Sequence, residues 1–217
     1  RGTVVKERFI AKGQKLLHWR KTKMPAISRS LEKRIFHFAK KNMGGFDKIV
    51  ISDYRHGFIT ESLAQKIISL AKRHRKPVYA DSQISEGFSG NRFWFRGADT
   101  MLLNQAEAES IFPGFSESKL GSSLKAIKKI LRVNSVVVKL GKNGAAALIG
   151  ETSFSAKRSP VKAVDTVGAG DAFLTALALV PGKISKQALE LANAWAALST
   201  TISGTERFSP FPRFPAT

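Results

Sequence analysis

The chain has 217 residues, 43% hydrophobic and 24% charged, which is the composition of a folded globular protein rather than a disordered one. It has no cysteine, which excludes disulfides and thiolate metal sites, and no apolar run approaches the roughly 20 residues that span a bilayer. The formal net charge of +20 would attract polyanions, but no nucleic-acid-binding motif accompanies it. We therefore expect a basic, solvated surface on a cytoplasmic protein that binds neither membrane nor nucleic acid.

Hydrophobic periodicity predicts strands that alternate with helices. The helices begin at capping residues such as Ser28 and Thr60, and the strands are short apolar runs. In chain order we predict a strand at 3–11, a helix from Ser28 to Gly44-Gly45, a buried strand at 48–52, a helix from Thr60 to Lys76, strands at 78–80 and 101–103, helices at 104–112 and 118–131, a strand at 135–140, two or three short antiparallel strands within 145–164 with a hairpin turn at Gly150-Glu151, and helices at 172–180 and 185–201. This alternation predicts an α/β fold, with a mostly parallel sheet that is flanked by helices on both faces.

Three polar or glycine positions follow predicted strands of this sheet. Counted from the strand at 48–52, Asp53 comes after the first strand, Asn104 after the third and Gly141 after the fourth. Ligands of open α/β sheets bind beyond the carboxyl ends of the strands. We therefore expect these positions to lie at the ligand-binding edge.

The segment Asp165–Phe173, with the sequence D-T-V-G-A-G-D-A-F, is the most informative in the chain. It places a glycine-rich turn before a helix of small residues, and the first-turn N–H groups of a helix attract anions. Gly168 and Gly170 allow the backbone to approach a phosphate closely. Asp171 then stands where a general base meets an attacking hydroxyl.

This segment resembles the signature of the ribokinase-like (PfkB) carbohydrate kinases, and no P-loop pattern competes with it. The resemblance implies ATP-dependent phosphorylation of a sugar or sugar phosphate, with Mg²⁺. Asp171 would be the base, and the Gly168-Ala169-Gly170 turn would stabilise the transferring phosphate. The fold implied is ribokinase-like, with the N-terminal part of the domain absent from this chain.

The segment Asn104-Gln105-Ala106-Glu107 follows a predicted strand and resembles the N-x-x-E motif of the same family. Residues three apart share a helix face, so Asn104 and Glu107 point together. An amide beside a carboxylate suits water-held Mg²⁺ and phosphate oxygens. The alternative is plain helix capping by Asn104, with Glu107 stabilising the first turn. Asp165 is a second candidate for the ion.

Two further segments resemble the nucleotide site of these kinases. Lys139, Gly141 and Gly144 lie in a K-L-G-x-x-G run that would line the ATP site, with Lys139 near its phosphates. Asn193 stands in an Asn-Ala run that similar kinases place close to the adenine. For Asn193 the alternative is a helix that packs through its alanines.

The segment Ser52-Asp53-Tyr54-Arg55-His56-Gly57 resembles the S-D-Y-x-K-G segment of the heptose 7-phosphate kinases of lipopolysaccharide precursor synthesis. Asp53 is the candidate ligand of the acceptor hydroxyl. His56 stands where that branch has lysine, and Asp81-Ser82-Gln83 stands where it has D-P-K. Both departures remove a cation from the acceptor side. We expect His56 to be a surface-loop residue.

We therefore expect a kinase domain over residues 1–207 and a disordered tail over 208–217, within a longer protein. The best-supported acceptor is heptose 7-phosphate. The alternatives are a PfkB kinase for another sugar or a nucleoside, and a non-catalytic kinase fold that binds polyanions. A homodimer, and a nucleotidyltransferase that is fused or separate, are both compatible with the resemblance.

Overall fold

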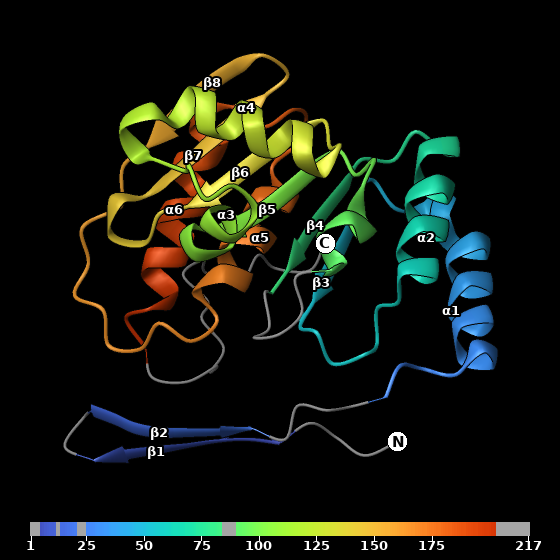
Figure 1. The fold of residues 1–217 in the computed structure, drawn as a ribbon, viewed down its shortest axis with the longest axis horizontal. Coiled ribbons are helices and arrows are strands. Elements are labelled where there is room, and N and C mark those ends of the chain that lie inside the picture. Colours follow the sequence, from blue (N-terminus) through green and yellow to red (C-terminus); the bar gives the residue numbers. More distant parts are fainter. Residues whose placement is uncertain (1–4, 12–13, 21–24, 84–89, 203–217) are drawn as a thin grey trace, which may run out of the picture. The chain divides into compact units, whose positions relative to one another are not determined.

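The computed structural model describes residues 5–11, 14–20, 25–83 and 90–202 (Figure 1). The chain forms two compact units, residues 1–98 and residues 99–217. The tail predicted at 208–217 lies outside the described residues. Across the parts of the chain that the structure describes, no helix has both the length and the apolarity needed to cross a bilayer.

The first unit begins with an antiparallel hairpin of β1 (Lys6–Ala11) and β2 (Gln14–Arg20), whose register shifts between Phe9 and Ile10. Strand β1 confirms the prediction at 3–11, whereas β2 was missed. Charged and polar residues interrupt its hydrophobic alternation, so the sequence pattern alone does not mark it as a strand. Phe9 and Leu17 are cross-strand partners, and both side chains are exposed.

The rest of the first unit alternates helix and strand as predicted. Ser28 and Thr60 cap their helices by accepting hydrogen bonds from the N–H groups of Leu31 and Leu63. The elements are α1 (Arg29–Asn42), η1 (Met43–Gly45), β3 (Ile49–Asp53), α2 (Glu61–Arg73), β4 (Val78–Ser82) and η2 (Gly90–Phe95). Strands β3 and β4 pair in parallel, from Ile49 opposite Val78 to Asp53 opposite Ser82.

The prediction of a buried strand at 48–52 is wrong for its central residue. Val50 is 45% exposed, while Ile51 beside it is buried. An apolar run in an α/β sequence is typical of a strand covered on both faces. Within the described residues, β3 is the terminal strand in the order of the sheet, so one of its edges and part of one face remain open.

Helices α1 and α2 are joined through the carboxylate of Glu32. The hydroxyls of Thr60 and Ser62 donate to it at 2.7 and 2.6 Å, and Lys66 Nζ donates at 2.8 Å. These partners hold the pKa of Glu32 at about 2, chiefly through the hydrogen bond from Lys66. Because the side chain is only 12% exposed, water screens this interaction weakly.

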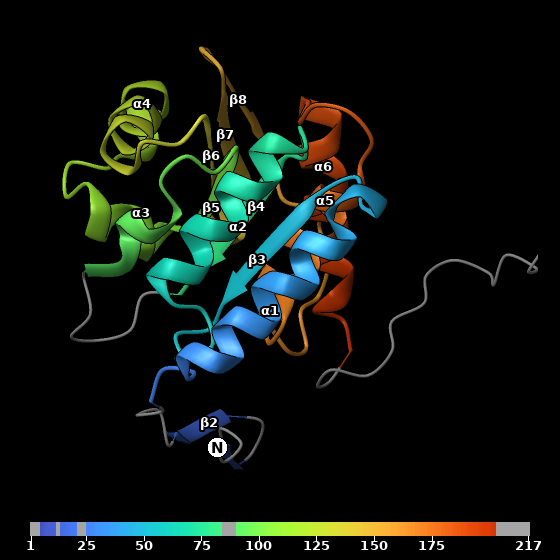
Figure 2. The same cartoon turned by 90° about the vertical axis from the view of Figure 1, so that its right-hand side faces the viewer.

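The second unit carries a sheet with helices on both faces. Its elements are β5 (Thr100–Asn104), α3 (Gln105–Ile111), η3 (Glu117–Lys119), α4 (Leu120–Leu131), β6 (Ser135–Lys139), η4 (Gly141–Asn143), β7 (Ala145–Ile149), β8 (Thr152–Ala156), α5 (Ala169–Leu179) and α6 (Lys186–Ser199). Strands β5 and β6 are parallel, and β7 and β8 continue the sheet in antiparallel order. Figure 2 shows α3 and α4 on one face and α5 and α6 on the other.

The core of the second unit confirms the expected double coverage of its central strand. Val136, Val137 and Val138 are fully buried, as residues on both faces of an inner strand should be. The hairpin at Gly150 is also confirmed, with φ of +61°. Of the two or three antiparallel strands predicted within 145–164 the structure has two, β7 and β8, and residues 157–164 form no strand. The predicted start of the next helix needs correction, because α5 begins at Ala169 rather than at 172.

We predict that Glu32→Gln destabilises the first unit by roughly 2–3 kcal/mol at pH 7, because the neutral amide cannot replace the charged carboxylate as the partner of Lys66. A carboxylate with a lowered folded pKa stabilises the protein above its unfolded pKa of 4.5, and this stability is lost as the pH falls toward about 2. The free energy of unfolding, measured with urea, should therefore differ between variant and parent by the whole of this amount at pH 7 and by close to zero at pH 2.

The matched control is Glu190→Gln, which removes an exposed carboxylate 3.9 Å from Lys186. Such surface pairs contribute little to stability, so the free energy of unfolding of Glu190→Gln should stay within about 0.5 kcal/mol of that of the parent at every pH. Equal behaviour of the two variants at pH 7 would contradict the role of Glu32.

Candidate active site

The glycine turn that precedes α5 is fixed at both of its ends. The carboxylate of Asp165 accepts a hydrogen bond from Val167 N–H at 3.0 Å, which closes the turn locally. The carbonyl of Thr200, at the end of α6, accepts from the N–H groups of Val164 and Asp165 at 2.7 and 3.0 Å. The turn is therefore anchored to α6, and sequence reasoning missed Thr200 because a backbone carbonyl leaves no trace in residue type.

Gly168 directs the chain into α5. Its φ of +82° is a left-handed conformation that glycine adopts without strain. The first helical hydrogen bond runs from Ala172 N–H to Gly168 O at 2.9 Å, and no side chain caps this helix end. Within the turn predicted to stabilise the phosphate, the N–H of Ala169 donates to Thr166 O at 3.3 Å.

Asp171 occupies the first turn of α5, and its residue is exposed. The partial positive charge of a helix N-terminus stabilises both a carboxylate and a bound phosphate there. Asp171 is therefore accessible to a hydroxyl that reaches a phosphate bound at this end of the helix.

Lys139 brings a cation to this helix end. It is the last residue of β6, and its Nζ lies 3.4 Å from the point that a Cβ would occupy at Gly170. In the parallel pairing of β5 with β6, Lys139 lies opposite Asn104. The structure thus brings Asn104, Lys139 and the first turn of α5 to the same region of the second unit.

Asn104 and Glu107 form a reciprocal capping box at the start of α3. Asn104 Oδ1 accepts from Glu107 N–H at 2.9 Å, and Glu107 Oε2 accepts from Asn104 N–H at 2.7 Å. Glu107 is only 4% exposed. The helix-capping alternative therefore describes the contacts that these two residues make, while their role toward phosphate or Mg²⁺ stays a prediction. Gln105 donates to Glu109, and Ala106 is exposed on the same turn.

The turn after β6 depends on glycine at position 144. Gly141 begins a short turn that Gly144 closes, with Gly144 N–H donating to Gly141 O at 3.1 Å. Gly144 has φ of +89°, and a Cβ built there would meet the carbonyl oxygen of Ala156 at 2.1 Å. Only glycine fits at this position, so β7 leaves the turn in direct contact with the end of β8.

Asn193 reaches the same carbonyl from α6. Its amide Nδ2 donates to Ala156 O at 3.1 Å, and the residue is buried among the alanines of that helix. The amide therefore ties α6 to the end of β8. This contact realises the packing alternative of the sequence analysis, and proximity to an adenine stays a prediction.

Asp53 lies at the end of β3 in the first unit. Its carboxylate is 3% exposed and accepts hydrogen bonds from Arg55 N–H (2.9 Å), Arg55 Nη1 (3.3 Å) and the Ser82 hydroxyl (3.0 Å). Its contacts within the chain are thus those of a residue that shapes its own loop. Direct binding of an acceptor hydroxyl stays a prediction.

Arg55 is the residue that Asp53 holds. It has φ of +61°, and its guanidinium stacks on Trp94 at 5.0 Å from the ring centre. Burial lowers the pKa of Arg55, and the charge of Asp53 opposes that shift. Sequence reasoning passed over Arg55 and Ser82, although both stand in segments that it had marked. His56 lies in the loop after β3, as expected, but it is half-buried and both of its ring nitrogens are shielded from solvent.

No three His, Cys, Asp or Glu side chains among the described residues are grouped so that they could hold a metal ion. Mg²⁺ keeps several waters and is commonly bound through one or two carboxylates together with substrate phosphates. Glu107 and Asp165 each accept a hydrogen bond from a backbone N–H group, and their role as ligands of such an ion stays a prediction.

Comparison with known proteins identifies relatives along most of the chain. Residues 37–212 match the family model described as pfkB family carbohydrate kinase. The bifunctional protein HldE of Helicobacter pylori (strain J99) is 27% identical over 202 residues, which cover 91% of this chain and 42% of HldE. For HldE of Trichlorobacter lovleyi the identity is 26% over 215 residues, covering 97% and 43%. The chain thus spans less than half the length of these curated relatives.

Solved structures of similar fold are also kinases. Phosphofructokinase-2 of Escherichia coli, in complex with potassium, matches with a TM-score of 0.67 and 22% identity, over 87% of this chain and 62% of that chain. Arabidopsis thaliana ribokinase, complexed with ribose and ATP, matches with a TM-score of 0.65 and 24% identity, over 89% and 61%. At these identities the likeness establishes a ribokinase-like α/β fold.

We predict that Gly144→Ala destabilises the second unit by at least about 3 kcal/mol, because the new methyl group would overlap the Ala156 carbonyl. Gly150→Ala is the matched control, since Gly150 also has a positive φ but no atom within 4 Å of the built Cβ. The control should lose only about 1 kcal/mol, for its left-handed backbone. If urea unfolding showed similar losses of unfolding free energy in the two variants, the contact with Ala156 would be unimportant for stability.

Proposed function

The chain belongs to the pfkB family of carbohydrate kinases, and from this premise we propose that it transfers a phosphoryl group from ATP to a hydroxyl of a sugar or sugar phosphate. The observation that carries the proposal is the first turn of α5. Asp171 lies in this turn, whose N-terminus no side chain caps. The Lys139 ammonium lies beside Gly170 of the same turn.

Asp171 accepts the proton of the attacking hydroxyl. Phosphoryl transfer passes through a loose transition state, so little proton loss is needed before attack, and an exposed carboxylate is a sufficient base. The backbone of the Gly168–Asp171 turn faces the charge that develops on the transferring phosphate. One such donor contributes about 3 kcal/mol in comparable sites.

Lys139 adds a positive charge beside Gly170. A lysine ammonium binds phosphate as a point charge. Gly141 and Gly144, on the turn that follows Lys139, would line the nucleotide site, and Asn193 would lie toward the base. Glu107 and Asp165 would hold Mg²⁺ through water, and that ion would neutralise charge on the phosphates.

The proposed acceptor is heptose 7-phosphate. The support is the S-D-Y segment at Ser52–Tyr54 and the similarity to HldE proteins at 26–27% identity. His56 and Gln83, which replace lysines of that branch, argue for testing other sugars beside it. The HldE relatives are bifunctional proteins more than twice as long as the matched region, so we propose that a nucleotidyltransferase, on the same chain or a separate one, uses the product.

We predict that Asp171→Asn lowers ADP release from Mg-ATP and sugar by at least about 10³-fold while ATP binding is unchanged, because the amide keeps the shape but cannot accept the proton. The measurement is ADP release with heptose 7-phosphate and a panel of sugars and nucleosides, together with nucleotide affinity by calorimetry. Asp47→Asn, at another exposed aspartate, is the control.

Substantial turnover by Asp171→Asn would contradict the assignment of the base. If the folded parent chain released no ADP with any acceptor but bound nucleic acid in a salt-sensitive manner, the non-catalytic alternative suggested by the charge of +20 would replace the proposal.

We predict that Glu107→Gln raises the Mg²⁺ concentration needed for half-maximal turnover several-fold without loss of stability. Glutamine can still accept from Asn104 N–H, so the capping box survives while the charge is lost. Glu109→Gln, on the same helix and exposed, should change neither property. An unchanged Mg²⁺ requirement in Glu107→Gln would leave Glu107 with a capping role alone.

A further inference from the structure

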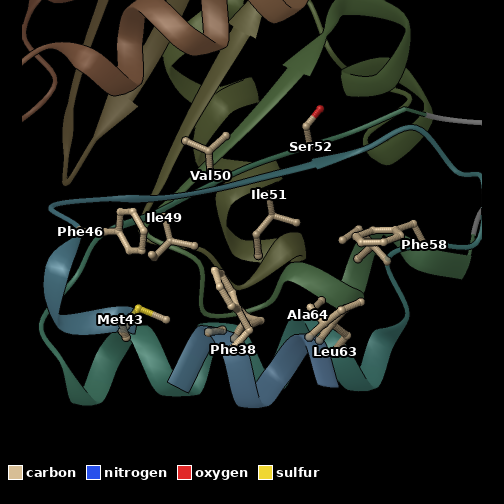
Figure 3. A pocket seen from close by; sticks show the side chains of 14 residues that line it. Phe38, Met43, Phe46, Ile49, Val50, Ile51, Ser52, Phe58, Leu63 and Ala64 are labelled. Carbon is tan, nitrogen blue, oxygen red and sulfur yellow. The ribbon is translucent and has the colours of Figure 1, made fainter. Parts of the chain in front are cut away.

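The first unit holds an apolar pocket of about 340 Å³ that is lined by β3 and the helices α1 and α2. In Figure 3, Ile49 and Ile51 point from β3 toward Phe38 on the helical side. Among the described residues, those that line the pocket are apolar except for Ser52, so no charged group stands there to orient a phosphate. A polar contact in the second unit is linked more directly to the proposed chemistry.

That contact reaches the turn between β6 and β7, residues 140–144, which we call the β6–β7 turn. The turn is closed by its own backbone, since Leu140 N–H donates to Gly144 O at 2.7 Å and Asn143 N–H donates to Leu140 O at 3.1 Å. It joins Lys139, the last residue of β6, to the strand that pairs with β6 in antiparallel order. The shape of the turn therefore affects the end of β6 as well as the proposed nucleotide site.

The two glycines of the β6–β7 turn have different surroundings. A Cβ at Gly144 would overlap the carbonyl of Ala156, so this side of the turn is packed against the chain. A Cβ built at Gly141 has no atom of the described residues within 4 Å. Lys142 and Asn143, which lie between the glycines, are both exposed. The turn thus has a packed side and an open side, and a nucleotide can approach its backbone from the open side.

The side chain of Glu117 reaches the exposed part of this turn from another segment of the second unit. Asn143 Nδ2 donates to Glu117 Oε2 at 2.9 Å and to Oε1 at 3.1 Å. Both distances are those of good N–H···O hydrogen bonds, and a charged acceptor makes such a bond stronger than a neutral one does. Because the two residues are 26 positions apart in the chain, the bond ties the turn to a distant segment.

The segment that carries Glu117 is itself anchored in the core. Glu117 is half-buried and begins η3, directly after Ser116. The hydroxyl of Ser123 on α4 is buried, accepts from Ser116 N–H at 3.1 Å and donates to Ser116 O at 3.4 Å. Leu124 and Ile127 of the same helix are fully buried. The carboxylate therefore stands on backbone that is tied to α4, which makes it a firm anchor for the turn.

The negative charge of Glu117 separates two possible roles. A carboxylate beside a nucleotide site repels the phosphates of ATP, so its removal would by charge alone tighten ATP binding. The removal of an anchor would weaken ATP binding instead, because the turn would lose its fixed shape. The two effects have opposite signs, so a measurement of affinity distinguishes them.

From the hydrogen bonds between Asn143 and Glu117 we infer that Glu117 is a positioning residue for the nucleotide. It acts through Asn143, holds the β6–β7 turn in the shape that receives ATP, and touches neither the nucleotide nor the acceptor. This inference rests on the proposed function of the site.

The test measures ATP affinity of the whole chain by calorimetry without acceptor, so that it does not depend on turnover. Glu117→Ala and Asn143→Ala should each weaken ATP binding about five- to tenfold, because each leaves the turn without its anchor. The double variant should bind ATP no more weakly than either single variant, since the two residues form one contact. Amide hydrogen exchange at Asn143 and Gly144 should be faster in Glu117→Ala than in the parent.

Reversal of the hydrogen bond is a sharper test of the same contact. Asn143→Asp places two carboxylates side by side and should weaken ATP binding at least about tenfold. When Glu117→Gln is added, the glutamine amide can donate to the new aspartate, and the affinity should return to within about twofold of the parent. Glu117→Gln alone keeps an acceptor oxygen for Asn143 and should weaken ATP binding less than Glu117→Ala does.

Glu151→Ala is the matched control. Glu151 follows the other end of β7 and is an exposed carboxylate that accepts from Lys128 Nζ at 3.0 Å. Its removal should leave the ATP affinity unchanged. The midpoint of urea unfolding should shift little in all of these variants, because both contacts lie near the surface.

Tighter ATP binding by Glu117→Ala would overturn the inference, because it would show that the charge acts on the phosphates directly. Unchanged affinity in Glu117→Ala, or a failure of Glu117→Gln to rescue Asn143→Asp, would overturn it as well. If the parent chain bound no ATP, the proposed function would fail and this inference would fail with it, whereas a parent that binds ATP confines any failure to Glu117.

Discussion

The parallel pairing of β5 with β6 is the constraint on which the candidate site depends. Because parallel strands end at the same edge, Asn104 and Lys139 become neighbours as soon as the two strands are in register. Each strand then passes into a different structure, a capped helix after Asn104 and a glycine turn after Lys139. Asn104 and Lys139 are thus placed beside each other by the backbone hydrogen bonds of the sheet.

A few backbone carbonyls hold the remaining parts of the second unit in place. Ala156 O contacts Gly144 and accepts from Asn193, which joins the turn after β6 to α6. Thr200 O holds the glycine turn before α5. Rigid placement matters for a kinase, since catalysis of phosphoryl transfer rests on position and electrostatics more than on covalent chemistry.

Much of this arrangement could be predicted from sequence. The order of helices and strands, the caps at Ser28 and Thr60, and the helix after Gly168 follow from local patterns, because each depends on residues close in the chain. Burial was harder to predict: Val50 reads as a core residue, yet whether a strand is covered depends on which strands lie beside it. The start of α5 was placed three residues late, because glycine and alanine before Asp171 suggest a turn and not a helix.

The side-chain roles show the same limit. The N-x-x-E pattern predicted either a phosphate site or a cap, and the capping contacts became visible only in three dimensions. The position of Asp53 after a strand predicts a ligand-binding residue, but its partners Arg55 and Ser82 come from a tight loop and from a neighbouring strand. Pairings of this kind depend on register, which residue type does not encode.

The double acceptance by Thr200 O has a consequence for how this protein can change in length. One residue inserted into α6 would rotate everything after it by about 100°, since the helix has 3.6 residues per turn, and would turn this carbonyl away from Val164 and Asp165. The loop between α5 and α6 carries no such constraint at its exposed residues 181–183. Natural variation in length among close relatives should therefore accumulate in that loop, while the number of residues in α6 stays constant.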